Sequence, residues 1–421
     1  KTQKVNLVWL KRDLRLRDHE PIFKASSDGL PVLLLYIIEP ILLEDPHYDL
    51  RHWRFIWQSL EDINQQLSQF NTQVLVMQGE ATAVFEQLYH SLNIQHVYSH
   101  EEIGLHNTFE RDRSLANWCN EREIPWTECC YGAVIRGLTQ RHDWDKNWQR
   151  RMRHSCFDRA LELIIFLPLT HQVFEQQARS MPEAWLKPNS QFQLGGEKRA
   201  WFTLHHFFKE RGKDYAYSIS SPTASRKACS RLSPYLAWGN ISLRQVYQFT
   251  LGNWQKPGWR RSLVAFTSRL HWHCHFVQKF ESEIEMQYRP VNRAYEHYHY
   301  DYTEQTKENI EAWKTGQTGF PIIDACMRCL HQTGYINFRM RAMLVSFLCH
   351  QLDIDWREGV CHLAKLFLDF EPGIPYPQFH MQAGITGINL IRLYNPIKQS
   401  QEKDPEGVFI QKWCPELAGL P

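Results

Sequence analysis

Three side chains in the run CSRLSPYL at 229–236 could bind phosphate: Ser230, Arg231 and Ser233. A guanidinium, hydroxyls and the N–H groups of a helix start are the donors that a diphosphate needs. The GGE sequence at 195–197 opens another helical segment and offers similar backbone donors. The same run is also typical of an ordinary helix cap with proline just inside the helix. Spacing alone leaves phosphate binding and capping both open.

Two groups of residues have the spacing of metal ligands. The sequence CMRC at 326–329, with Cys349 and Cys361 downstream, could supply four thiolates to an iron–sulfur cluster. His271 and His275 are four residues apart on a helical segment and could share a zinc ion. The CMRC cysteines lie in a helical block, and no carboxylate motif completes the histidine pair. We therefore expect no metal.

The first 130 residues alternate apolar runs with helical patterns, which predicts a doubly wound parallel sheet. Apolar positions near a 3.6 spacing predict covering helices at 50–67 and 81–92. The predicted strands lie within VNLVWL at 5–10, PVLLLYII at 31–38, TQVLVMQG at 72–79 and IQHVYSH at 94–100.

The second half of the chain predicts an all-α domain, because helix-length periodic segments follow one another there. The segments include 198–211 and a helix ending at Gly334 as its C-terminal cap. Prolines and mixed polar residues between the halves indicate a linker. We expect an α/β domain at 1–131, a linker at 132–194 and an α-helical cofactor domain at 195–421.

The composition is globular, with 43% hydrophobic and 22% charged residues, but rich in aromatics: 16 Trp, 17 Tyr and 23 Phe. Such rings suit either an aromatic core or stacking on flat ligands and bases. A net charge of +2 excludes a histone-like binder and leaves a local basic patch for any nucleic acid. Scattered cysteines indicate reduced thiols. No apolar run predicts a membrane span or signal peptide, so we expect a cytoplasmic or nucleoid-associated location.

Several ordered blocks together resemble the photolyase/cryptochrome family over nearly the whole chain. Because of this resemblance, we expect the CSRLSPYL run to bind the phosphates of FAD and not merely to cap a helix. The blocks are VWLKRDLRLRDHEPI at 8–22, GGEKRAW at 195–201, CSRLSPYLAWGNISLRQVY at 229–247, GQTGFPIIDACMRCLHQTGYINFRMRAMLVSFL at 316–348, LDIDWREG at 352–359 and IRLYNPIKQSQEKDPEGVFIQKWCPEL at 391–417.

The resemblance implies FAD as the cofactor and places its contacts. Arg341 and Asp369 match an ion pair beside the flavin ring, where a paired charge suits flavin chemistry. Cys229 stands where the family usually has threonine and lacks that hydroxyl donor. The full set of implied FAD contacts is Tyr217, Cys229, Ser230, Arg231, Leu232, Ser233, Phe266, Arg341, Asp369, Phe370, Glu371 and Pro375.

The resemblance also implies repair of pyrimidine dimers flipped out of DNA. Trp272 matches a tryptophan that stacks on the lesion, and Arg339 and Arg392 match arginines that face phosphates at the cavity rim. UV-damaged DNA, including single-stranded DNA, is the expected partner. We expect a monomer that does not bind membranes.

Several positions depart from the dimer-repair pattern. Arg269 replaces a carboxylate that accepts hydrogen bonds from the lesion, and Met381 replaces a second stacking tryptophan. Pro375 stands where a residue near the flavin is commonly asparagine, and Ser221 replaces an arginine that contacts DNA. These changes favour the alternative, a cryptochrome-type blue-light receptor that uses FAD for signalling.

The electron-supply chain of the family is altered as well. Of the three relay tryptophans only Trp356 matches; the flavin-proximal one becomes Phe379, and the outermost falls at Thr303. A tyrosine-rich stretch at 295–302, with Trp313, offers another route, although such tyrosines also suit simple packing.

The family commonly binds a second, antenna chromophore in its N-terminal domain: a folate, a deazaflavin or a flavin. Glu101 and Glu102 follow the predicted strand that ends near Ser99, where a pterin-binding acid can occur.

Overall fold

The computed structural model describes residues 3–419, and its chain divides into two compact units. Unit 1 contains residues up to Phe202 together with Leu232–Gly252. Unit 2 contains Thr203–Arg231 and the chain from Asn253 onward. The sequence boundaries at 131 and 194 remain predictions. Within residues 3–419 no helix is long and apolar enough to span a bilayer.

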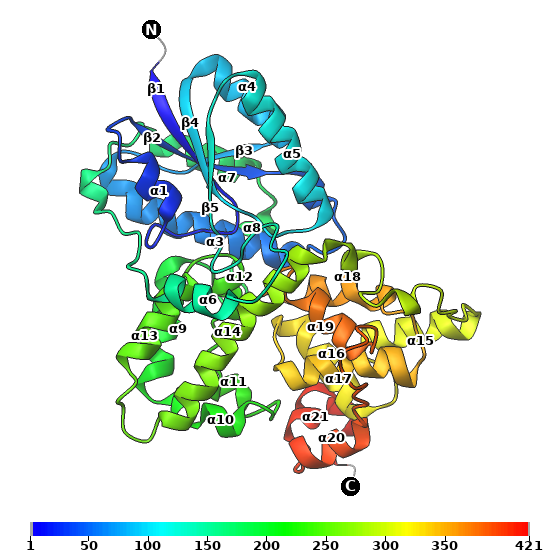
Figure 1. Ribbon diagram of the computed structural model, residues 1–421. Coiled ribbons are helices and arrows are strands. Elements are labelled where there is room, and N and C mark those ends of the chain that lie inside the picture. The colour runs from blue at the N-terminus through cyan, green and yellow to red at the C-terminus, as the bar shows by residue number, and fades with distance from the viewer. Residues whose placement is uncertain (1–2, 420–421) are drawn as a thin grey trace. The chain divides into compact units, whose positions relative to one another are not determined.

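Unit 1 is built on a five-stranded, all-parallel sheet in the order β3-β2-β1-β4-β5 (Figure 1). The strands are β1 Lys4–Leu10, β2 Val32–Ile38, β3 Leu75–Gln78, β4 Asn93–His100 and β5 Trp126–Cys129. The strand order reverses between β1 and β4, so the sheet is doubly wound as predicted. The fifth strand was not predicted, because its four residues carry no long apolar run.

Helices cover the sheet because its strands are apolar on both faces. Leu7 and Trp9 of β1 share a buried core with Phe85 of α4 and Leu115 and Trp118 of α5. The helices of unit 1 are α1 Glu20–Ala25, α2 Pro40–Leu43, α3 Leu50–Leu67, α4 Ala81–Ser91, α5 His106–Glu121, α6 Trp144–Arg153, α7 His171–Ser180, α8 Glu183–Leu186, α12 Ser233–Ala237 and α13 Leu243–Gly252. The predicted linker thus carries α6, α7 and α8.

All regular elements of unit 2 in the described chain are helical, as predicted. The helix α16 shows how the sequence sets both ends of a helix. Pro321 lies in its first turn, and Gly334 ends it in the left-handed conformation, with φ of 71°. The helix α9 Glu197–Lys209 crosses the boundary between the units. The helices of unit 2 are α10 Tyr215–Ser218, α11 Ser225–Ala228, α14 Arg260–Ser282, α15 Glu304–Thr315, α16 Pro321–Thr333, α17 Phe338–Ser346, α18 Arg357–Leu366, α19 Pro375–Gln382, α20 Pro396–Lys403 and α21 Val408–Trp413.

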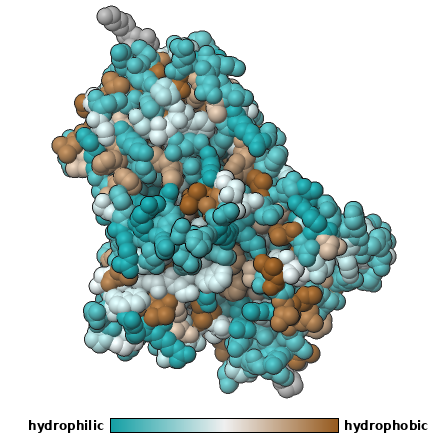
Figure 2. Space-filling model, in the orientation of Figure 1, coloured by the Kyte–Doolittle hydropathy of each residue, from teal (hydrophilic) through white to brown (hydrophobic). Residues whose placement is uncertain are grey.

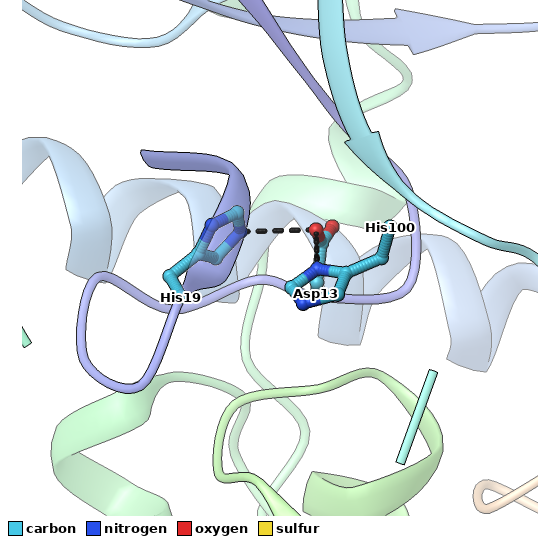
Figure 3. A group of neighbouring side chains, drawn as sticks. All are labelled: Asp13, His19 and His100. Carbon is cyan, nitrogen blue, oxygen red and sulfur yellow. Dashed lines mark hydrogen bonds and ion pairs between the residues drawn. The ribbon is translucent and has the colours of Figure 1, made fainter. Parts of the chain in front are cut away.

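A buried polar cluster fixes the loop after β1 to the end of β4 (Figure 3). Asp13 Oδ2 lies 2.7 Å from His100 Nδ1 and 2.9 Å from His19 Nε2. Asp13 Oδ1 also accepts the Lys11 N–H at 2.8 Å. These contacts hold the pKa of Asp13 well below its usual range, although burial alone would raise it. The carboxylate therefore stays charged and bridges two segments.

We predict that acid destabilises the protein partly through His100. Burial lowers the pKa of His100 to about 4, so the folded state keeps the ring neutral while the unfolded chain takes up a proton near pH 6.5. This stability is complete above about pH 6.5 and is lost as the pH falls towards 4. His100→Gln should lower the urea midpoint at pH 7 but flatten its fall between pH 7 and 5. The exposed control His90→Gln should match wild type; equal slopes in all three proteins would contradict this prediction.

Candidate functional site

In unit 2, Arg211 organises the loop that carries Cys229 and Ser230. Its guanidinium donates to the carbonyl of Ser230 at 2.7 Å, to that of Lys227 at 2.9 Å and to that of Cys229. Arg211 Nε donates to His206 Nδ1 at 2.9 Å. Backbone carbonyls, instead of a carboxylate, thus hold this guanidinium, so its full charge is not cancelled by a neighbouring anion.

Further guanidinium groups surround the same loop. Arg226 donates to the Tyr335 carbonyl at 3.0 Å, and Arg231 lies 3.8 Å from the centre of the Tyr335 ring. Burial, together with the charge of Arg231, lowers the pKa of Arg211 to about 10. Burial also lowers the pKa of Arg231, and Arg226 adds to that shift. Burial is the larger cause of both shifts, and the gathering of three guanidinium groups around one loop favours an anionic ligand.

Arg231 itself has a left-handed backbone, with φ of 62°. Residues other than glycine adopt this conformation rarely, at a cost of about 1–2 kcal/mol. Such strain gathers at ligand sites, where the surrounding structure imposes it. The conformation supports a functional role for this loop.

An ion pair joins Arg341 on α17 to Asp369 in the loop after α18. Arg341 donates two hydrogen bonds to the carboxylate of Asp369 in a bidentate arrangement, with N–O distances of 2.9 and 2.8 Å. Phe370 and Glu371 follow in the loop and are buried, and Pro375 begins α19. A planar guanidinium fork on a carboxylate fixes the orientation of both groups. The structure thus builds the Arg341–Asp369 pair that the sequence predicted.

The helix α14 presents an aromatic side chain to solvent. Trp272 is 42% exposed and packs against Phe276 at 5.6 Å and His275 at 4.9 Å between ring centres. Arg269 lies one turn earlier on α14 and is exposed. Phe266, by contrast, is buried against Phe207, with ring centres 5.0 Å apart.

The remaining predicted contacts differ in exposure and in the unit to which they belong. Tyr217 on α10 is exposed, with the Arg261 guanidinium 4.5 Å from its ring centre. Arg392 is exposed, while Arg339 and Met381 are half-buried. Leu232 and Ser233 belong to unit 1, where Ser233 is the first residue of α12.

The segment around Arg392 is unusually apolar for a surface. Leu390 is 91% exposed and Ile388 is 78% exposed, and Ile391 and Leu393 are exposed as well. Figure 2 shows hydrophobic surface on this face of the molecule. The stretch 386–398 contains Arg392 and Lys398 but no acidic residue. Exposed apolar side chains with cations suit a partner that is both flat and anionic.

The backbone amides at 195–197 already have hydrogen-bond partners within the protein. The amides at 195–197 were expected to face phosphate, but the Gly195 N–H donates to Gln58 Oε1 at 2.8 Å and the Glu197 N–H donates to Asp62 Oδ2 at 2.9 Å. Both partners lie on α3. Side chains of unit 1 therefore already satisfy this helix start.

Trp356, Phe379 and Trp313 of the predicted relay are buried, whereas Tyr298 and Tyr302 are exposed. Trp356 is buried with its ring centre 4.4 Å from that of His380, and Phe379 is buried as well. Trp313 is buried and donates its indole N–H to the Leu344 carbonyl at 3.1 Å, as a core tryptophan does. Tyr298 and Tyr300 lie 4.8 Å apart in an edge-on contact.

Unit 1 contains a cavity at the carboxyl ends of β1, β2 and β4, enclosing about 380 Å³ with its open mouth included. This is the point where the strand order reverses, where open α/β sheets bind ligands. Arg111 joins Glu39 at 2.7 Å and Glu102 in its wall. Burial raises the pKa of Glu39 to about 7, although Arg111 opposes this. The predicted residue Glu102 thus lines a cavity with aromatic walls and a few charged side chains.

A metal site needs a particular spacing of its ligands, which matters first for a buried histidine–aspartate group and then for the two groups predicted from the sequence. Among residues 3–419, Asp13, His19 and His100 are the group of side chains whose ligand atoms converge. Their 2.7 and 2.9 Å contacts are shorter than the spacing of about 3.3 Å between tetrahedral zinc ligands, and they fit hydrogen bonds. His19 Nδ1 accepts the Ile22 N–H at 3.2 Å, which leaves the ring proton on Nε2, the atom a metal would need. The structure gathers neither the four thiols nor the His271–His275 pair into such a group.

The comparisons with known proteins agree with this architecture. Residues 6–136 match the family described as DNA photolyase, and residues 266–421 match the FAD binding domain of DNA photolyase. The chain belongs to the photolyase/cryptochrome family. FAD is accordingly its cofactor.

Both cryptochromes and photolyases are similar to the chain. A cryptochrome DASH of Synechocystis sp. is 27% identical over 99% of this chain and 88% of its own length. A deoxyribodipyrimidine photo-lyase of Vibrio cholerae is 27% identical over 99% of this chain and 91% of its own length. The structure of an archaeal photolyase from Sulfolobus tokodaii with two FAD molecules has a TM-score of 0.80 and 25% identity, covering 99% of this chain and 91% of that one.

The residues of unit 2 suit FAD. Its diphosphate needs positive charge, and the arginines around Cys229 and Ser230 provide it. No local sequence pattern points to Arg211, because its partners are carbonyls 16 to 19 residues away. The pKa shifts of neighbouring arginines are the signal that finds it.

We predict that Arg211→Gln weakens FAD binding by about tenfold or more, because it frees the carbonyls at 227–230 and leaves them unpaired. Equilibrium dialysis of FAD gives the affinity. Trypsin cleavage at Lys227 should also become faster, since the loop loses its anchor. The control is Arg260→Gln, an exposed arginine elsewhere in unit 2. If both variants bind FAD equally well, Arg211 does not organise the site.

Proposed function

We propose that this family member is a light-driven FAD enzyme that repairs pyrimidine dimers in DNA whose bases are unpaired. The observation that carries the proposal is Trp272, which presents an indole face to solvent on α14. Tryptophan is a large side chain that is mostly buried in folded proteins, so the exposure of Trp272 needs a reason. Stacking on an extruded base, at about 1–3 kcal/mol per base, is such a reason.

The segment 386–398 supports unpaired DNA as the substrate. Its exposed Leu390 and Leu393 can pack on unstacked bases, while Arg392 and Lys398 attract phosphates. A regular duplex offers mainly its charged backbone to such a surface and keeps its bases stacked inside. Single strands, bubbles and loops expose the flat faces that apolar side chains contact.

Arg269 supports a lesion contact of altered chemistry. It stands one turn before Trp272 and carries donors where a carboxylate would accept. Pyrimidine carbonyl oxygens and flanking phosphates are acceptors that a guanidinium can bind. The expected base contact is therefore to oxygens of the lesion instead of to its N–H groups.

Within the cofactor site, each residue has a distinct task. FAD, when bound, supplies the light absorption and the electron for repair. Arg211 and Arg231 hold the diphosphate side, and the Arg341–Asp369 pair holds charge beside the ring system. Buried Phe370 keeps water from the loop. For the cavity of unit 1, we propose an antenna chromophore, with Glu39 and Glu102 as its polar contacts.

Blue-light signalling is the second candidate. Pro375 supports it, because its side chain offers no hydrogen bond where the repair pattern commonly has asparagine. A receptor would photoreduce FAD but would leave dimers intact. Turnover on DNA therefore separates the two functions.

We predict that the reduced holoprotein, under blue light, removes dimers from a single-stranded oligonucleotide at least about tenfold faster than from the same duplex. Chromatography of the digested DNA measures the remaining lesion. The dark reaction is the control. Normal photoreduction of FAD without loss of dimers on either substrate would instead support signalling.

We predict that the double substitution Leu390→Ser and Leu393→Ser weakens binding of single-stranded dimer DNA by about tenfold, because two base-packing side chains are lost. Duplex binding should change less than about twofold, since phosphate contacts remain. Fluorescence anisotropy measures both. The matched control is Val408→Ser, an exposed apolar residue on α21. Equal losses on both DNA forms would exclude base packing by this segment.

A further inference from the structure

A second ion pair holds the loop that carries Asp369. His273 Nε2 on α14 lies 3.0 Å from Glu371 Oε2, and the two side chains are 17% and 4% exposed. Asp369, two residues earlier, is held by Arg341 on α17. Cations from two different helices therefore hold one short loop, through two acids separated by a single residue.

His273 carries a positive charge in this setting. Burial alone would lower its pKa, but the Glu371 carboxylate, with a smaller contribution from Cys274 on the same helix, raises it to about 10. From α19, which packs against α14, His380 adds no charge, because burial lowers its pKa to about 4. The ring of His273 is an imidazolium at neutral pH.

The position of His273 links two parts of the proposed site. It follows Trp272 directly on α14, and its partner Glu371 follows Phe370 in the loop. A helix residue that grips this loop fixes the stacking tryptophan and the cofactor loop to one rigid element. No local sequence pattern joins the two, since 98 residues separate them.

We propose that His273 is a positioning residue of the FAD site, which clamps the loop Asp369–Glu371 to α14 and places a positive charge beside the bound cofactor. This inference rests on the FAD site described above. Arg341 forms one half of the clamp, and His273 forms the other. Because both His273 and Glu371 are largely buried, losing one partner leaves an unpaired charge, while losing both removes the charges together.

A double-mutant cycle on FAD binding tests the clamp. The variants are His273→Gln, Glu371→Gln and both together, with His271→Gln as a matched histidine control on the same helix. Each single clamp variant should weaken FAD binding by about tenfold or more, and the double variant should bind more tightly than the product of the two losses predicts, by at least about threefold. The control should bind FAD as wild type does. Additive losses would overturn the clamp.

A measurement without FAD gives an independent test. Nitrogen-15 NMR of histidine-labelled apoprotein should show one imidazole, absent from His273→Gln, that stays doubly protonated up to about pH 9. The signal should lose its proton at a lower pH in Glu371→Gln. A neutral His273 ring at pH 7.5 in wild type would overturn the proposal. If wild type bound no FAD, the FAD site itself would fail, while the NMR result would still decide whether the charged pair exists.

Discussion

Partly buried positive charge is the constraint on which unit 2 depends. A guanidinium cannot leave water unless other groups replace its hydration. Arg341 meets this need with the carboxylate of Asp369, whereas Arg211 meets it with carbonyls of the loop at 227–230. Arg231 lies over the ring of Tyr335. Carbonyls and rings solvate a cation without cancelling its charge, so the site keeps the capacity to bind an anion.

The same constraint orders the surrounding elements. Arg211 belongs to the short turn after α9, yet it determines the path of the chain at Cys229 and Ser230. Arg341 and His273 come from different helices, yet both hold the loop between α18 and α19. Charge pairing over long sequence distances thus positions residues that local helix formation alone leaves apart. Exposed Trp272 lies on one of the helices so fixed, which connects cofactor binding to the proposed contact with DNA.

The sequence predicted the architecture well where the physical signal was local. Apolar runs predicted β1, β2, β3 and β4, and proline and glycine predicted the ends of α16. Trp126–Cys129 was missed because a four-residue edge strand has no periodicity to detect. The Arg341–Asp369 pair came from family resemblance, and its geometry is present. The amides at 195–197 were misjudged because their partners, Gln58 and Asp62, lie on a distant helix. Arg211 and His273 were missed for the same reason: their roles depend on tertiary contacts.

The most direct test of a cation-rich diphosphate site is to compare FAD with riboflavin, which has the same ring system and no phosphate. The apoprotein should bind FAD at least about a hundredfold more tightly than riboflavin, and the difference should shrink as salt is raised. Equal affinity for the two flavins at low salt would contradict the account, because the arginines around Cys229 and Ser230 would then contribute nothing to binding.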